Sequence, residues 1–213
     1  MENSQAYKDF IKQIEATGRE KMDGYYPLTL ENIYECEREE VEDIIWHNFV
    51  DKNDSALALF MPKLKKYKGI DALKSKLHTY DIPSGASVNI AEILYIISNE
   101  KQYISVINQN YKLSTNSYEK VSIVAKLSRL AKNENVYSNL IDIYISDNDS
   151  INQLSALCGI LWADGYLSDI DNFNEITEKM ELLRMFRADT AEKRREIIIK
   201  YGNEEFEKYK NLT

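Results

Sequence analysis

The sequence predicts an all-α protein, an α-solenoid built as a stack of antiparallel helix pairs. The chain of 213 residues has only 7 glycines and 3 prolines, too few for the many tight turns of a β architecture. Apolar residues recur at helical spacing along the chain, and no strand-like alternation persists. A two-helix pattern also repeats in the middle of the chain, which is typical of stacked helical units.

The N-terminal part is expected to contain two helices. The first covers residues 5–17. Four apolar residues share one of its faces: Tyr7, Phe10, Ile11 and Ile14. Residues 18–28 form a loop, and Thr29 is expected to cap a long helix over residues 30–50. Residues 1–54 would cap the helix stack or form a separate arm, and a cap is the favoured interpretation.

The remainder, residues 55–213, is expected to form helical repeats that end in a C-terminal capping helix. Asp54 precedes the first helix and can cap it. Short polar separators then divide the chain into helices. The expected helices are 55–66, 69–79, 86–98, 101–112, 117–132, 135–146, 151–163, 168–187 and 190–209.

The internal repeat has an offset of 34 residues, which aligns residues 91–107 with residues 125–141. The matched positions are Ala91 with Ala125, Leu94 with Ser128, Asn99-Glu100 with Asn133-Glu134, Tyr103 with Tyr137, and Ile107 with Ile141. A looser copy begins near Ala156. One helix pair cannot bury its own apolar face, so neighbouring pairs must share a core. The small residues that begin each copy would let helices approach closely.

In this pattern residues 55–187 resemble the HEAT-like and armadillo-like helical repeats. The resemblance implies stacked helix pairs with an extended binding surface. The proline and the Asp/Arg pair that are typical of HEAT repeats are missing here, which leaves the sub-family open.

The sequence contains none of the common catalytic motifs. It has no phosphate-binding glycine loop, no HExxH and no CxxC. Its two histidines are His47, four residues after Asp43, and His78 at a helix end; both are interpreted as structural or surface residues. The run from Asp147 to Ser150 lacks the glycine and glutamate of a calcium loop and is interpreted as a helix-capping turn. No enzyme, catalytic residue, metal site or cofactor is therefore expected.

Cysteine usage and hydropathy point to the cytoplasm. Cys36 and Cys158 imply no disulfide framework, and the apolar run around Cys158 predicts a core position. The N-terminus is polar, and no apolar run is long enough to span a membrane.

The charge pattern indicates a basic protein partner. The net charge of −8 opposes binding to nucleic acid, which needs a basic footprint, but suits a basic protein. Because equivalent turns of a solenoid stack along one edge, a group of later acids with one tyrosine is expected to form a ridge: Asp142, Asp147, Asp149, Asp164, Tyr166, Asp169 and Asp171. An alternative binding surface lies in the earlier acidic run: Glu35, Glu39, Glu42 and Asp43. The simpler interpretation of both is solvated faces and helix caps.

Two further groups of side chains bear on binding. The lysines between Lys63 and Lys68 are expected to form a solvated face. Of the 15 tyrosines, Tyr103 and Tyr137 are expected in the core. Three others lie in expected loops and would be interface anchors: Tyr25, Tyr26 and Tyr166.

In profile the chain looks like the helical-repeat immunity proteins that are encoded beside secreted polymorphic toxins. That resemblance implies an inhibitor that binds a toxin, often a nuclease, and covers its active site; a phage-encoded inhibitor of a host defence enzyme is closely similar. The alternative is a general helical-repeat scaffold or regulatory adaptor. An enzyme of the helical-repeat DNA glycosylase kind is disfavoured, because it needs a basic groove.

Overall fold

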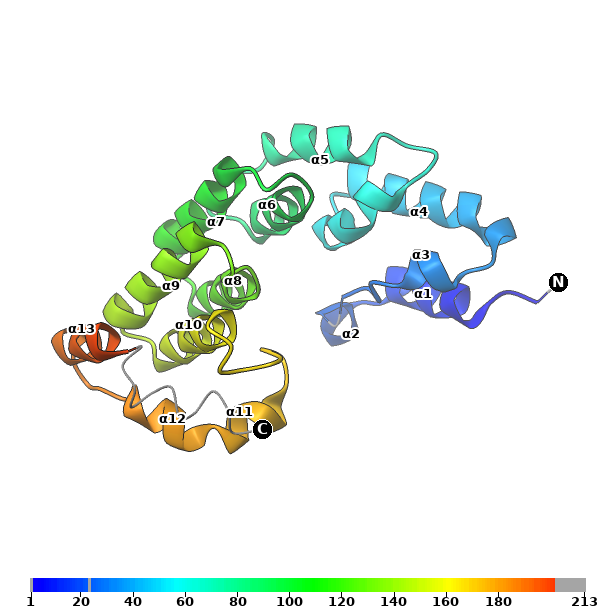
Figure 1. Ribbon diagram of the computed structural model, residues 1–213. Helices are drawn as coiled ribbons and strands as arrows, with labels where there is room; N and C mark the ends of the chain where they lie inside the picture. Colours follow the sequence, from blue (N-terminus) through cyan, green and yellow to red (C-terminus); the bar gives the residue numbers. More distant parts are fainter. Residues whose placement is uncertain (1, 23, 202–213) are drawn as a thin grey trace. The chain divides into compact units, whose positions relative to one another are not determined.

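The computed structural model describes residues 2–22 and 24–201. Within these ranges the chain is helical and contains no strand, which confirms the all-α prediction (Figure 1). The contacts group into two compact units, Met1–Gln109 (unit 1) and Asn110–Thr213 (unit 2). No helix of the described part is long and apolar enough to cross a membrane.

Unit 1 begins with short helices. In order they are α1 (Gln5–Glu15), α2 (Gly18–Met22), α3 (Thr29–Asn32), the 3-10 helix η1 (Glu35–Glu37), α4 (Arg38–Val50), the 3-10 helix η2 (Ser55–Lys63), α5 (Gly69–Leu77), α6 (Gly85–Ser98) and α7 (Lys101–Leu113), which runs on into unit 2. Helix η2 packs against α4, α5 and α6. The expected cap, residues 1–54, thus lies in the same unit as the helices that follow it.

An aromatic cluster forms part of the core of unit 1. The rings of Phe10, Tyr25 and Phe60 pack with centroids 6.0–6.2 Å apart. Close backbone packing adds to it, because a Cβ atom on Gly69 would lie only 1.9 Å from the carbonyl oxygen of Met61. Only glycine fits there, so the turn into α5 is fixed against η2.

Unit 2 is organised around α10. Its helices are α8 (Ser117–Arg129), α9 (Glu134–Ser146), α10 (Ser150–Ala163), α11 (Phe173–Glu178), α12 (Met180–Met185) and α13 (Ala191–Lys200). Helix α10 packs against both α8 and α9. The Ser128 hydroxyl of α8 donates to the carbonyl oxygen of Ser155 at 2.8 Å, and a Cβ on Gly159 would lie 2.8 Å from the Ser128 Cα. Ser128 and Gly159, rather than Ala125, which is half-buried, set this close approach.

The long helix expected over residues 30–50 is broken. Helix α3 ends at Asn32, and Ile33 is extended with φ −79° and ψ 158°. The break is stabilised by buried Glu37, whose carboxylate accepts from the Ser4 amide at 2.7 Å, the Ser4 hydroxyl at 2.6 Å and the Tyr34 amide at 2.8 Å. Thr29 is the first residue of α3 and not its cap. The prediction of one long helix was wrong because the break depends on Ser4, which lies 33 residues before Glu37 in the sequence.

Three other expected elements differ from the structure. The loop over 18–28 contains α2, and the helix expected over 55–66 is the 3-10 helix η2. The helix expected over 168–187 is divided into α11 and α12, because Asn172 caps a new helix by accepting from the amides of Asn174 and Glu175. Helix α13 covers Ala191–Lys200, and residues 202–209 of the expected last helix lie outside the described part. The remaining helices agree to within a few residues.

Candidate functional site

The earlier acidic run is matched by lysines that follow η2. Lys65 pairs with Glu35 at 3.2 Å, and Lys66 pairs with Glu39 at 3.0 Å and Asp43 at 2.8 Å. Bonds from Lys66 and from the Tyr67 hydroxyl lower the pKa of Asp43. Lys65 and Lys66 are exposed, as expected for a solvated face, and they also pair with the acids. The alternative binding surface already has counter-charges within the chain.

Glu42, the remaining member of that alternative set, is not on the surface. It is only 1% exposed. Desolvation opposes its ionisation, but bonds from Arg38 at 2.6 Å and from the amides of Lys65 and Lys66 at 2.8–3.1 Å outweigh it and lower its pKa. Glu42 fixes the lysine loop against α4, so it cannot contact a partner.

The later acids do not form one ridge. Asp149 is the N-cap of α10 and Asp164 its C-cap, so the length of a helix, roughly 20 Å at 1.5 Å per residue, separates them. Because consecutive helices run antiparallel, the turns that join them lie alternately at opposite ends of the helices. The single edge expected from the sequence is therefore split into two.

At the N-terminal end of α10 the acids are structural. Asp149 accepts from the amides of Ile151 and Asn152, which confirms the capping turn. Asp147 accepts from the Tyr111 hydroxyl, from the Asn152 side chain at 3.0 Å and from the Asp149 amide at 2.7 Å. Desolvation opposes ionisation of Asp147, but these bonds outweigh it and lower its pKa.

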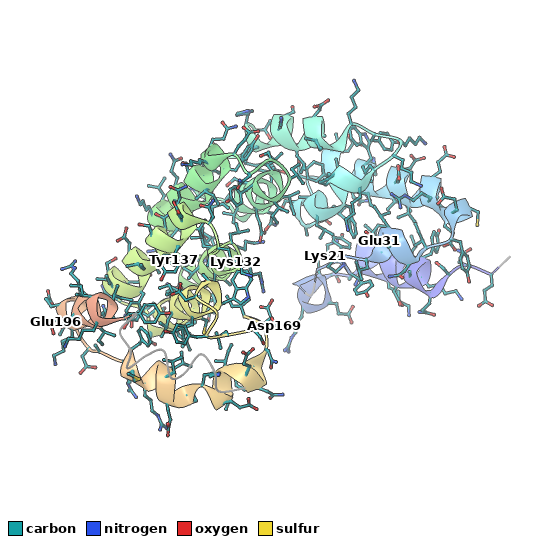
Figure 2. The ribbon with its side chains drawn as sticks, viewed as in Figure 1. Lys21, Glu31, Lys132, Tyr137, Asp169 and Glu196 are labelled. Atoms are coloured by element: carbon teal, nitrogen blue, oxygen red, sulfur yellow. The ribbon has the colours of Figure 1, made fainter. Side chains whose placement is uncertain are left out.

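At the C-terminal end of α10 the acids are more open. Asp164 accepts from the Tyr137 hydroxyl at 2.7 Å, and Asp171 pairs with Arg129 at 3.0 Å. Asp169, labelled in Figure 2, is exposed and forms no ion pair with any described residue. The same holds for Glu134, which lines a hollow of about 290 Å³ together with Lys132, Tyr137 and Asp164.

Phe173 follows Asp171 by two residues in the sequence. It begins α11 and is 77% exposed. The loop before it is held by Glu175, whose carboxylate accepts from the amides of Ser168 and Asp169 at 2.7 and 3.1 Å. We call this surface the acidic end and define it as Glu134, Asp164, Asp169, Asp171 and Phe173. Sequence reasoning missed Phe173, although its polar neighbours and its poor fit to the apolar spacing were a usable signal.

The acidic end belongs to a stretch of sequence without basic residues. Between Lys132 and Lys179 there is no lysine, arginine or histidine. Carboxylates recur throughout it, at Glu134, Asp142, Asp147, Asp149, Asp164, Asp169, Asp171, Glu175 and Glu178. Two cations approach from α8 and the turn after it: Arg129 pairs with Asp171, and Lys132 lies 4.4 Å from the centre of the Trp162 ring. Asp142, on α9, is exposed and forms no ion pair with the described residues.

The tyrosines expected as anchors are mostly buried. Tyr166 is 3% exposed and Tyr25 is 6% exposed. Tyr25 donates to Asp54 at 2.6 Å. Only Tyr26, at 51%, is open to solvent. Tyr166 is thus removed from the binding set. Tyr166 does lie in a loop, as expected, but its ring is buried.

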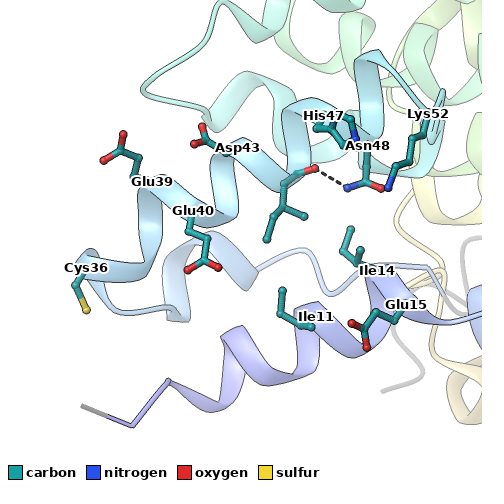
Figure 3. A pocket seen from close by; sticks show the side chains of 11 residues that line it. Ile11, Ile14, Glu15, Cys36, Glu39, Glu40, Asp43, His47, Asn48 and Lys52 are labelled. Carbon is teal, nitrogen blue, oxygen red and sulfur yellow. Dashed lines mark hydrogen bonds between the residues drawn. The ribbon is translucent and has the colours of Figure 1, made fainter.

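Unit 1 contains a separate groove between α1 and α4 (Figure 3). Its volume is about 730 Å³. Isoleucines and carboxylates line it, with one lysine: Ile11, Ile14, Ile44, Glu15, Glu39, Glu40, Asp43 and Lys52. Cys36, His47 and Asn48 also line it. His47 contacts Asp51 at 2.7 Å and not Asp43.

The described residues contain no group of three or more side chains placed to hold a metal ion. Searches of protein-family models, of characterised proteins and of solved structures find no match to this chain.

Proposed function

We propose that this chain is a non-enzymatic binding module for a basic protein, and that the acidic end is its contact surface. The observation that carries the proposal is the exposed ring of Phe173 in a stretch of sequence that contains nine carboxylates and no lysine or arginine. In unit 1, by contrast, the lysines after η2 compensate Glu35, Glu39 and Asp43.

The two components of the acidic end have different roles in binding. Glu134 and Asp169, which form no ion pair with described residues, contribute a long-range field that accelerates encounter with a basic surface and disfavours acidic ones. An exposed aromatic ring supplies contact area at low entropic cost and is the usual kind of anchor at the centre of an interface. The site therefore suits a partner with an apolar depression surrounded by lysine or arginine.

Within this class we propose an inhibitor of the immunity-protein kind, which acts in the cytoplasm and covers the basic working surface of a toxin such as a nuclease. A HEAT-like stack of helix pairs is the architecture proposed for its repeats, since such stacks present extended surfaces. A general scaffold or regulatory adaptor is the second candidate, because the same surface would serve it.

Site-specific photo-crosslinking tests the proposal. A photoreactive phenylalanine analogue replaces Phe173 in the full chain, which is expressed in cells that carry its gene. A matched control places the analogue at Glu196, which is exposed on α13. We expect position 173, and not position 196, to capture a protein of positive net charge, identified by mass spectrometry. The purified partner should lose its own activity when the chain is added.

Three outcomes would decide against parts of this proposal. Capture of an acidic protein, or equal capture from both positions, would contradict the acidic end as the contact surface. A basic partner whose activity is unchanged by the chain would favour the adaptor over the inhibitor.

A further inference from the structure

In unit 1 the N-terminal part of α1 is tied to the residues at the start of α4. The Ser4 amide and hydroxyl donate to Glu37, and the Tyr7 hydroxyl donates to Glu40 at 2.8 Å. Beyond these bonds, Phe10 turns into the core, where it is fully buried. Ile11 and Ile14 remain half-exposed and rise from α1 toward α4 (Figure 3).

The floor of the groove between α1 and α4 is apolar. Ile11 and Ile14 lie three positions apart on α1, so they share one helix face. Ile44 of α4 lines the same groove. All three side chains are only partly covered by the described residues. The groove has a volume of about 730 Å³ and is broadly open to solvent.

The border of the groove is acidic. Four carboxylates and one lysine line it. Lys66 compensates two of the carboxylates, Glu39 and Asp43. The other two, Glu15 and Glu40, form no ion pair with described residues, and Glu40 points from α4 toward α1 (Figure 3). A cationic side chain beside the apolar floor would find its counter-charge there.

We infer that this groove binds an amphipathic α-helix of a partner protein, with apolar residues at positions i, i+4 and i+7 on the isoleucine floor and lysine or arginine beside Glu15 and Glu40. Helix-in-groove recognition uses this spacing. The inference rests on the proposed function in one respect, since the helix would belong to the same basic partner. Its contacts are confined to unit 1 and are independent of the acidic end.

Cys36 provides a reporter in the native sequence. It is exposed and borders the groove, whereas Cys158 is buried. The experiment measures the rate at which a thiol reagent modifies Cys36 in the full chain, with and without a synthetic peptide probe. The probe is a helix with leucines at i, i+4 and i+7 and lysines beside them. One control peptide has the same composition in scrambled order, and a second has glutamate in place of lysine.

We expect the basic amphipathic peptide to slow the modification of Cys36 and both controls to leave it unchanged. Changing Glu15 and Glu40 to lysine should weaken the protection by about tenfold in peptide concentration. Ile14→Ser should also weaken the protection, because it removes apolar surface from the floor of the groove. The single change Glu15→Lys tests the same contact in a variant that should fold normally, because the Glu15 carboxylate forms no hydrogen bond or ion pair with the described residues. The matched control, Asp142→Lys with Glu196→Lys, changes net charge equally in unit 2.

Equal protection by the scrambled peptide, or undiminished protection in the Glu15→Lys variant, would overturn the inference. So would an unchanged rate with the basic amphipathic peptide at saturating concentration. The crosslinking experiment at position 173 tests the proposed function by itself. Failure of one proposal is therefore distinguishable from failure of the other.

Discussion

Glu42 is a charged side chain that the fold buries rather than offers to a partner. It is enclosed by Arg38 and by two backbone amides of the loop after η2. Its carboxylate therefore connects segments of chain that are separated by more than twenty residues. Burying such a charge costs desolvation free energy. Removing it strongly destabilises the protein, because its buried partner is then left without a counter-charge.

Replacing Glu42 by glutamine should destabilise the protein by about 2–4 kcal/mol at neutral pH, because the amide cannot compensate Arg38. The pKa of Glu42 is lowered in the folded state, so its stabilising contribution is present above the unfolded pKa, about 4.5. That contribution is lost as the pH falls through the lower, folded value. The measurement is urea unfolding of both proteins as a function of pH.

The difference between the wild-type and E42Q free energies of unfolding should shrink toward zero at low pH. Glu39→Gln is the control, because the Glu39 side chain is 79% exposed and its surface ion pair contributes little. A difference that stays constant with pH would show that the charge of Glu42 is not what stabilises this loop.

The two cysteines should differ sharply in reactivity. Burial raises the pKa of the Cys158 thiol to about 11, whereas Cys36 is exposed. Since the thiolate is the reactive form, one thiol per chain should react rapidly with a disulfide reagent at mildly alkaline pH. The second should react only after denaturation. Rapid reaction of two thiols in the folded protein would contradict the core position of Cys158.

Local residue roles were predictable from the sequence, whereas long-range ones were not. The caps at Asp54 and Asp149 were expected, because a cap depends only on the amides that follow it. The pairing of Lys66 with Glu39 and Asp43 was not, because it depends on how η2 returns beside α4. The repeat pairs Asn99 with Asn133, yet Asn99 ends α6 in a left-handed conformation with φ 56° and Asn133 caps α9.

Among the elements, the close contact between α8 and α10 is the most specific feature of unit 2. Gly159 is buried against Ser128, and the Ser128 hydroxyl bonds to the backbone of α10. Sequence reasoning anticipated close approach through small residues but placed it at the repeat alanines. The exact contact depends on helix rotation, which apolar periodicity does not resolve.

Gly159→Ala should destabilise unit 2 by about 1–3 kcal/mol, because the added Cβ overlaps Ser128 and forces α8 and α10 apart. Gly85→Ala is the matched control. Gly85 begins α6 and has open space where its Cβ would be, so this change should be neutral or slightly stabilising. Thermal unfolding followed by circular dichroism compares the two. Equal midpoints would contradict the tight packing of α8 on α10.

At the scale of the whole molecule, the net charge of −8 is distributed unevenly over the described surfaces. Composition predicted an acidic exterior but could not tell which acids have partners in the fold. The structure leaves Asp142, Asp169 and Glu134 without ion pairs among described residues, while Asp147 and Asp149 serve the capping turn. The binding hypothesis therefore depends on fewer acids than the sequence offered.

The most direct test is the association rate of the chain with the partner captured at Phe173, measured by stopped flow at low and physiological ionic strength. Glu134→Lys with Asp169→Lys is compared with Glu20→Lys and Glu196→Lys, a double change of equal charge at exposed sites elsewhere. We predict that the first pair slows association by about tenfold at low salt and flattens its salt dependence, while the second has a much smaller effect. Equal rates for the two variants would contradict the acidic end as the surface that recognises the partner.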